Sequence, residues 1–494
     1  TIGIADEIRT RLKSIPNLYL SKPEDEVGAE LVLTSSIEKM TDRVRISYRI
    51  SRRADGVQVA GASMEGKLEN MLTLQAELAD KVADGLAAQF DLELVRKDAV
   101  KQQPDPEAYQ YYLQAREYAK RPDDRQTLGT SVSLYRKAIL ADSRFAEAYA
   151  GLCDSYWGMY LIQRQMELVE QAEQACLEAE ALNADLAEVQ VALGAIYNGR
   201  GKWRESIRAY NKAIKIEPRN LRAFVGLADV YTNIGKPEIA EQTYKRAIGL
   251  QPGNWEAWTK YGNYQIGTGQ FFEAEKSFRK VVALIPDSIN AYSNLGAALL
   301  YLGDFKQAAK VFSKQAELKP SAVIMSNLAT MYYYDGDFER AARIYKMAIE
   351  MAPRQCLYWS NLGDALHQLP NREEDARDAD EWALDFCEKE IEINPENHEA
   401  LVAKCKLLAR SGQIEEALLM IEEHDLLDSQ HPMDKLYLAM VFLRAGDMGA
   451  VENTLEQAVQ QGYSRTLILA EPEFVPVRGE PWFKALVDEG GGNN

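Results

Sequence analysis

The stretch INAYSNLGAALLYLGDFKQAAKVFSKQAELKP, residues 289–320, decides the fold because its pattern recurs throughout residues 187–355. Copies begin at Ala187, Leu221, Trp255, Ile289 and Ala322, at intervals of 34, 34, 34 and 33 residues. Each copy has an apolar-small pair at positions 7 and 8, glycine at 15, a small residue at 20, an aromatic residue at 24 and proline at 32. A pattern kept in five successive copies indicates one repeated structural unit.

The spacing within the unit predicts two antiparallel helices. Positions 4, 7, 8 and 11 share one face of a first helix, and positions 20, 24 and 27 share one face of a second. Glycine at position 15 permits the left-handed turn that ends the first helix, and proline at 32 separates one unit from the next. One hairpin cannot bury its own apolar face, so neighbouring hairpins must stack. We therefore expect a long surface to carry the function.

This unit resembles the tetratricopeptide repeat. Less regular copies extend the pattern to residues 106–145, 146–186, 356–397, 398–431 and 432–463, which brings the total to about ten units. The second copy has extra residues near 159–166, and the eighth has an acidic insertion at 371–380. The resemblance implies a mainly α protein, a right-handed α-solenoid of about ten helix hairpins. A small α/β domain precedes it.

The first hundred residues follow another period. Residues 4–15 and 68–90 carry helical apolar stripes, and residues 18–20, 29–38, 43–52 and 58–65 suggest strands. In the third of these strands, apolar and polar residues alternate, which predicts one buried face and one solvated face. The glycine-containing segment 53–56 predicts a hairpin turn to the next strand. In the second helix the apolar stripe consists of Leu72, Leu74, Leu78, Val82 and Leu86.

A second resemblance covers residues 2–110. The runs 5–8, 15–18, 29–37, 43–46 and 74–77 are similar to the TolB amino-terminal-like domain. The resemblance implies a bacterial signalling protein in which this domain stands before the repeats. It also implies an upstream effector, which is a Ser/Thr kinase, a class III nucleotide cyclase or a winged-helix DNA-binding domain. The family's first strand has no counterpart, because the chain starts at Thr1.

These patterns divide the chain into three parts. We expect the TolB-like α/β domain at residues 1–100, the repeat solenoid at 101–463 and a C-terminal capping segment at 464–494. The last part resembles the tail of other TolB-like repeat proteins. Its aromatic and aliphatic residues suit a cap on the final apolar face, which solenoids require.

A search for reaction chemistry gives no candidate. The four histidines are His367, His398, His424 and His431, and none has zinc-ligand spacing. The sequence contains no phosphate-binding loop, nucleophile elbow, kinase motif or cyclase signature. We therefore expect no catalytic, cofactor-binding or metal residues, and no enzyme activity in this chain.

Charge and hydropathy restrict the partners. The formal net charge is −18, which argues against direct binding of nucleic acid, because phosphate contacts need a basic surface. No apolar run reaches membrane-spanning length, so we expect no membrane insertion. A cytoplasmic location is expected, and a periplasmic one stays open if an upstream signal or anchor exists.

The five cysteines are Cys153, Cys176, Cys356, Cys387 and Cys405, and none belongs to a CxxC pair. Four of them stand at repeat positions 8 or 24, where core side chains belong. We expect buried free thiols of a reducing compartment in preference to disulfides or metal ligands.

One surface stands out from the repeats. Asparagine recurs at position 6 of three successive units, each time after serine, and an asparagine offers both a donor and an acceptor to the backbone of an extended peptide. Tyrosines at positions 12 and 13 could serve as apolar anchors. The candidate groove residues are Lys260, Asn263, Ser293, Asn294, Tyr301, Ser326, Asn327, Tyr333, Tyr334, Ser360, Asn361 and Asp364.

Two alternatives remain for this surface. In the first, the Ser-Asn pairs are a common choice in the repeat consensus, kept for good local hydrogen bonding and not for ligand binding. A clamp for a terminal carboxylate is the sharper alternative, and Lys260 and Asn263 would form one of its corners. That clamp is incomplete, because Thr259, Asn290 and Val323 stand where it needs cationic side chains.

The sequence therefore predicts a non-enzymatic interaction and scaffolding module. It binds a protein or peptide in the groove, and it is the regulatory or sensory part of a bacterial signalling protein. The alternative is the regulatory portion of a kinase, a cyclase or a winged-helix regulator whose effector lies upstream. Self-association into a homo-oligomer is also expected to be possible, because an incomplete sheet edge invites a partner.

Overall fold

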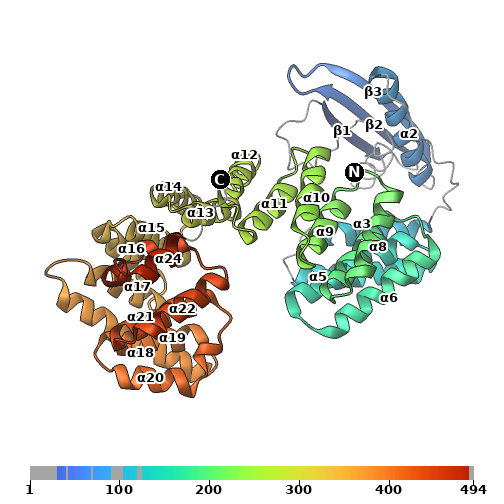
Figure 1. Ribbon diagram of the computed structural model, residues 1–494. Helices are drawn as coiled ribbons and strands as arrows, with labels where there is room; N and C mark the ends of the chain where they lie inside the picture. The colour runs from blue at the N-terminus through green and yellow to red at the C-terminus, as the bar shows by residue number, and fades with distance from the viewer. Residues whose placement is uncertain (1–30, 40–42, 68–70, 91–103, 120–124, 489–494) are drawn as a thin grey trace. The chain divides into compact units, whose positions relative to one another are not determined.

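The computed structural model describes residues 31–39, 43–67, 71–90, 104–119 and 125–488 (Figure 1). The expected helix over residues 4–15 and the expected strand at 18–20 lie outside the described residues. The chain separates into two compact units, residues 1–257 and 258–494. Each unit is mainly built from helix hairpins, and the first also contains a small sheet, which confirms the predicted fold class.

The sheet consists of β1 (Leu31–Lys39), β2 (Arg43–Arg52) and β3 (Gln58–Lys67), which are antiparallel in the order β1-β2-β3. Alternate side chains of β2 are at most 7% exposed, as predicted: Val44, Ile46, Tyr48 and Ile50. Helix α2 (Met71–Phe90) lies along this face and buries its predicted stripe there (Figure 1). The described part of the stripe is Leu74, Leu78, Val82 and Leu86.

The predicted turn joins β2 to β3. The N–H of Arg52 donates to the carbonyl of Val57 at 2.8 Å, and Gly56 adopts a φ of 70°. The Asp55 carboxylate accepts from the N–H of Val57 at 3.1 Å and from Arg52 at 2.9 Å. These contacts hold the pKa of Asp55 below its usual value, with the Val57 hydrogen bond as the main cause.

The hairpins of the first unit alternate first and second helices along the chain, and each bound lies within a few residues of the predicted repeat. They are α3 (Pro106–Ala119), α4 (Arg125–Ala141), α5 (Ala146–Gln163), α6 (Met166–Leu182), α7 (Ala187–Gly199), α8 (Trp203–Ile216), α9 (Leu221–Asn233) and α10 (Pro237–Leu250). Helix α11 (Trp255–Gly267) begins before the boundary between the units and ends after it.

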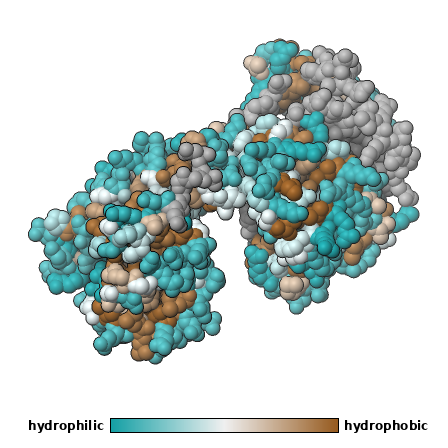
Figure 2. All heavy atoms as spheres, viewed as in Figure 1, coloured by the Kyte–Doolittle hydropathy of each residue, from teal (hydrophilic) through white to brown (hydrophobic). Residues whose placement is uncertain are grey.

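The second unit continues the alternation and ends in short helices. Its hairpin helices are α12 (Phe271–Leu284), α13 (Ile289–Leu302), α14 (Phe305–Leu318), α15 (Ala322–Tyr334), α16 (Phe338–Met351), α17 (Cys356–His367), α18 (Glu373–Ile393), α19 (His398–Arg410), α20 (Ile414–Glu423), α21 (Pro432–Ala445) and α22 (Met448–Gln460). The remaining helices are η2 (Leu426–Asp428), α23 (Arg465–Ala470), η3 (Pro472–Val477) and α24 (Pro481–Asp488). Charged and polar side chains cover most of the face shown in Figure 2, with hydrophobic patches between them.

The repeat positions act as the spacing predicts. All five glycines at position 15 have φ between 68° and 80°, so each ends its helix in the left-handed conformation: Gly201, Gly235, Gly269, Gly303 and Gly336. The small residues at position 20 are fully buried: Ser206, Ala240, Ala274, Ala308 and Ala341.

Position 8 faces the aromatic ring at position 24 of the same hairpin. A Cβ added at Gly296 would come within 2.5 Å of the Phe312 ring, and one at Gly262 within 2.6 Å of the Phe278 ring. Glycine or alanine at position 8 therefore sets how closely the two helices of a hairpin approach. The ring fills the space that a larger side chain would occupy.

Side-chain caps fix several helix starts. Asn220, Ser288 and Ser321 accept from the backbone N–H three residues later and so begin α9, α13 and α15. Asp304 and Asp337 do the same for α14 and α16. Each cap satisfies one N–H of the first helical turn, which contributes about 1 kcal/mol.

The expectation of free thiols is wrong for four of the five cysteines. Cys153 on α5 is bonded to Cys176 on α6, and Cys356 on α17 to Cys387 on α18. Their Cα atoms are 5.3 and 4.9 Å apart, which suits a disulfide. For the first pair the physical reason is that positions 8 and 24 meet inside a hairpin, as the glycine and ring do elsewhere. Cys356 stands at position 1 of its unit instead, and meets Cys387 where α17 packs against α18. Only Cys405 is a free, buried thiol.

The acidic insertion expected at residues 371–380 lengthens one helix. Helix α18 spans 21 residues, whereas its counterparts α14 and α16 span 14. The extension places Asp380 inside the unit with 9% of its surface exposed. Among the helices of the described residues, none is long and apolar enough to cross a membrane.

Candidate functional site

The predicted groove residues lie on α11, α13, α15 and α17, the first helices of four successive hairpins. All of them belong to the second unit. Lys260 and Asn263 are on α11 and are exposed. The three position-6 asparagines occupy equivalent places on α13, α15 and α17.

The asparagine amides are accessible and unpaired. Asn263 and Asn327 are exposed, and Asn294 and Asn361 are half-buried. Within the part of the chain that the structure describes, none of these four side chains has a hydrogen-bond partner. Each amide therefore retains its donors and its acceptor for a ligand.

The serines beside them point inward. Ser326 is 5% exposed and Ser360 is 1% exposed. Ser293 accepts a hydrogen bond from the Gln315 amide, which also donates to the carbonyl of Ile289 at 3.0 Å. Two of the serines are buried and the third is hydrogen-bonded within its own unit, so the accessible row consists of the asparagines.

The three tyrosines contact aromatic rings of the same unit. Tyr301 stacks on Phe271 with ring centroids 5.0 Å apart, and Tyr334 stacks on Phe305 at 5.4 Å. Tyr333 is 6% exposed and donates a hydrogen bond of 2.8 Å to Glu471. Tyr333 is thus engaged by the chain itself.

The segment after the last hairpin, residues 465–488, packs beside these three tyrosines. We refer to it as the C-terminal segment; it comprises α23, η3 and α24. Phe474 and Phe483 are fully buried in one core cluster with residues of α19, α21 and α22. Tyr301, Phe305 and Tyr334 pack against the same cluster. The C-terminal segment therefore covers the three tyrosines. It also packs against the last hairpin, which is the surface it was expected to cap.

A buried ionic network lies beside the C-terminal segment. Asp364 accepts from Lys406 at 2.7 Å and from Arg410, and Arg410 also donates to Asp380 at 2.8 Å. His367 contacts Asp380 at 2.8 Å. Burial raises the pKa of Asp364, but Lys406 and Arg410 outweigh it and lower that pKa to about 2. Asp364 is therefore ionised and engaged within the protein.

The C-terminal segment contributes two carboxylates to this region. Glu473 lies 3.4 Å from Arg444 and 3.9 Å from Arg410. Glu471 is 5% exposed, and burial, followed by repulsion from Asp364, raises its pKa to about 7. The hydrogen bond from Tyr333 acts in the opposite direction.

Sequence reasoning missed this network. Lys406, a member of the network, is 1% exposed, although lysine is rarely buried. No sequence signal marked it, because Lys406 is at position 9 of the unit that starts at His398, outside the apolar face formed by positions 4, 7, 8 and 11. Across the described residues, no group of three or more His, Cys, Asp or Glu side chains is arranged to hold a metal ion.

Comparisons with known proteins agree with the repeats. Family models described as tetratricopeptide repeat match residues 221–254, 289–321 and 321–352, and one described as TPR repeat matches 194–235. Together these matches cover about a quarter of the chain. No curated protein matches it.

Several solved structures are similar to parts of this chain. A structure of MamA protein is 23% identical over 35% of this chain and 94% of its own, with a TM-score of 0.31. The structure of YrrB, described as a TPR protein with an unusual peptide-binding site, is 21% identical over 38% of this chain and 94% of its own, with a TM-score of 0.28. Pseudomonas aeruginosa pilF is 19% identical over 42% of this chain and 92% of its own, with a TM-score of 0.34.

Proposed function

Because the chain carries tetratricopeptide repeats, we propose that it is a protein–protein interaction module that binds a peptide or protein segment on the second unit. The ligand lies along the first helices of the hairpins and contacts Asn263, Asn294, Asn327 and Asn361. The chain itself performs no catalysis in this proposal.

The unpaired asparagine amides carry the proposal. Three of them recur at position 6 on α13, α15 and α17, and the structure gives none of them an internal partner among the described residues. A side-chain amide accepts from a peptide N–H and donates to a peptide carbonyl, so a row of amides pairs with an extended backbone. Such pairing is independent of the ligand's sequence.

The C-terminal segment limits where the ligand lies. Tyr333 donates to Glu471 and Tyr301 packs against the cluster that contains Phe474, so these rings contact the chain's own residues. The ligand therefore contacts the asparagine row and reaches the tyrosines only where the C-terminal segment leaves a ring edge open.

The test uses an isolated binder, because the natural partner is unidentified. A random peptide library displayed on phage is selected on the purified protein, and the affinity of a recovered peptide is measured by fluorescence anisotropy. Alanine at Asn294, Asn327 and Asn361 together is expected to lower that affinity by about tenfold or more.

The matched control removes three exposed asparagines elsewhere, Asn211, Asn233 and Asn453, and is expected to bind as the unsubstituted protein does. Circular dichroism verifies that both triple variants are folded. Recovery of no binder above background, or equal affinity in the two triple variants, would reject the asparagine row as the binding surface.

We further propose that the module is the regulatory or sensory part of a bacterial signalling protein. The resemblance of the first hundred residues to the TolB amino-terminal-like domain supports this context, and the antiparallel sheet with its covering helix suits a small α/β domain. The non-enzymatic character is tested with ATP: phosphate release, phosphoryl transfer or cyclisation by the purified chain would contradict it.

A further inference from the structure

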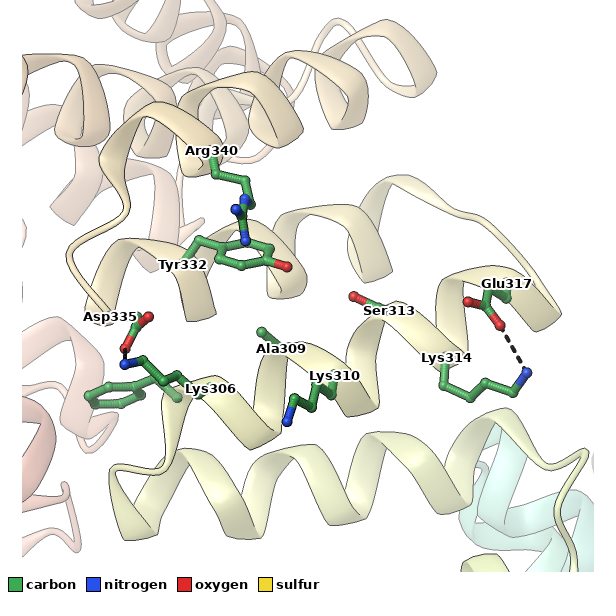
Figure 3. A pocket seen from close by; sticks show the side chains of 10 residues that line it. Lys306, Ala309, Lys310, Ser313, Lys314, Glu317, Tyr332, Asp335 and Arg340 are labelled. Carbon is green, nitrogen blue, oxygen red and sulfur yellow. Dashed lines mark hydrogen bonds and ion pairs between the residues drawn. The ribbon is translucent and has the colours of Figure 1, made fainter.

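A second surface of the same unit has the opposite charge from the chain as a whole. A cavity of about 500 Å³ opens between α14, the end of α15 and the start of α16 (Figure 3). Its cationic lining residues are Lys306, Lys310, Lys314 and Arg340, and its anionic ones are Glu317 and Asp335. The lining therefore carries +2, whereas the chain carries −18. It shares no residue with the asparagine row.

Small side chains create this cavity. Ala309 and Ser313 project from α14 toward Tyr332 on α15, and neither fills the space in front of the ring (Figure 3). The guanidinium of Arg340 lies 4.7 Å from the centroid of the Tyr332 ring and covers one of its faces. The Tyr332 ring therefore forms an aromatic wall of the cavity, and a cation covers one face of that ring.

The lysines form a regular row along α14. Lys306, Lys310 and Lys314 are four residues apart, so they share one side of the helix at intervals of about 6 Å. Lys276 and Lys280 on α12 stand 34 residues before Lys310 and Lys314, at the same two repeat positions. The basic character is therefore part of the repeat pattern of these second helices.

The row is available to a ligand. Lys310 makes no ion pair with any described residue. Lys306 lies 4.0 Å from Asp335, and Lys314 lies 2.8 Å from Glu317, with lysine side chains 78% and 53% exposed. Ion pairs this exposed contribute about 0–1 kcal/mol, so a ligand carboxylate can replace either partner.

The spacing indicates the shape of the ligand. Side chains on one side of an extended peptide repeat every two residues, at about 6.6 Å. That interval is close to the lysine interval of about 6 Å along α14. Carboxylates at alternate residues of an extended segment can therefore meet Lys306, Lys310 and Lys314 in turn. A single anion would engage only part of the row.

We propose that this cavity and its lysine row bind an extended acidic peptide segment with carboxylates at alternate residues. One side chain of the segment enters the cavity against Tyr332, and Arg340 neutralises a further carboxylate. The module would then have two binding surfaces in one unit, one for a peptide backbone and one for acidic side chains.

The test compares three labelled peptides by fluorescence anisotropy: ten residues of alternating glutamate and alanine, the same residues as five glutamates followed by five alanines, and alternating glutamine and alanine. The alternating acidic peptide is expected to bind tightest, the block peptide more weakly and the glutamine peptide not at all. Binding is expected to weaken with added salt. Equal binding of all three peptides would overturn the proposal.

Variants locate the binding. Glutamine at Lys306, Lys310 and Lys314 together is expected to lower the affinity for the alternating peptide about tenfold. Glutamine at Lys215, Lys236 and Lys245, which changes the net charge equally in the first unit, is expected to have no effect. An equal loss in both triple variants would assign the binding to net charge alone and overturn the proposal.

Two further outcomes separate this site from its alternatives. Inorganic phosphate is added at a concentration that supplies the same negative charge as the peptide. If phosphate displaces the peptide under that condition, the site binds simple anions, which contradicts the peptide proposal. Alanine at the three position-6 asparagines is expected to leave acidic-peptide binding unchanged, so failure of either proposed surface is recognised independently of the other.

Discussion

The phenolic hydroxyl of Tyr333 lies 2.8 Å from Oε1 of Glu471 and donates a hydrogen bond to it, although the two residues are 138 positions apart. This bond joins α15 to the C-terminal segment. Both side chains are buried, at 6% and 5% exposure. Because burial disfavours the charged form of Glu471, the stability of this contact depends on pH.

We predict that Glu471 makes the second unit more stable at acidic than at alkaline pH. Its pKa is raised from 4.5 to about 7, because burial disfavours the charged form. The folded protein therefore binds a proton that the unfolded chain releases between these values. The stabilisation is complete below about pH 4.5 and is lost as pH rises through 7. Its size is on the order of 1–3 kcal/mol.

Glu471→Gln tests this directly. The neutral amide accepts the Tyr333 hydrogen bond at every pH, so the variant is expected to exceed the unsubstituted protein in unfolding free energy at pH 8 and to match it near pH 5. Urea unfolding at several pH values measures this. Glu480→Gln, an exposed position of the same segment, serves as the control. A parallel pH profile for E471Q and the unsubstituted protein would contradict the prediction.

The buried network gives a second prediction. Asp364→Asn leaves Lys406 and Arg410 without their shared carboxylate, and both cations are nearly inaccessible to water. Removing one partner of a buried ion pair costs about 3–5 kcal/mol. Urea unfolding is expected to show that loss for D364N and less than about 0.5 kcal/mol for Asp385→Asn, whose pair with Lys389 is exposed. Similar losses in both variants would argue against the network.

Local periodicity made the hairpins predictable. Gly303 ends α13 with φ of 76°, and Phe312 is 5% exposed, because both positions depend only on neighbours within one repeat. The strands were predictable for the same reason, since alternation along β2 is a local property. Such signals need no knowledge of distant contacts.

Contacts between distant segments were not predictable. Nothing near Tyr333 in the sequence indicates that Glu471 will bond to it, and no motif marks Lys406 as the partner of Asp364. The cavity beside Tyr332 likewise depends on Ala309 and Ser313 of another repeat. The Cys153–Cys176 disulfide forms an intermediate case, because repeat alignment places Cys153 at position 8 and Cys176 at position 24, which meet within a hairpin.

The close approach within the hairpins gives a third prediction. Gly296→Ala would place a methyl group 2.5 Å from the Phe312 ring, so the two helices must separate or the ring must move. We expect a loss of about 1–3 kcal/mol in unfolding free energy. Gly129→Ala is the matched control, because its Cβ would meet no atom within 4 Å in α4. Alanine there is expected to stabilise by up to about 1 kcal/mol, and destabilisation by both variants would contradict the packing argument.

The cysteine pairing gives the last prediction, which thiol titration measures. Burial raises the pKa of the Cys405 thiol to about 12, so it is expected not to react with an aromatic disulfide reagent in the folded protein at neutral pH. Air-oxidised protein should give one reactive thiol after denaturation, and reduced, denatured protein should give five.

Reduction is also expected to lower the unfolding free energy. The two disulfides close segments of 23 and 31 residues, and a bond of this kind typically contributes about 2–4 kcal/mol by restricting the unfolded chain. Alanine at Cys153 and Cys176 together should remove one such contribution and make the remaining loss on reduction smaller. Three or more thiols in the oxidised, denatured protein would show that a pair does not form, and the stability difference on reduction would shrink accordingly.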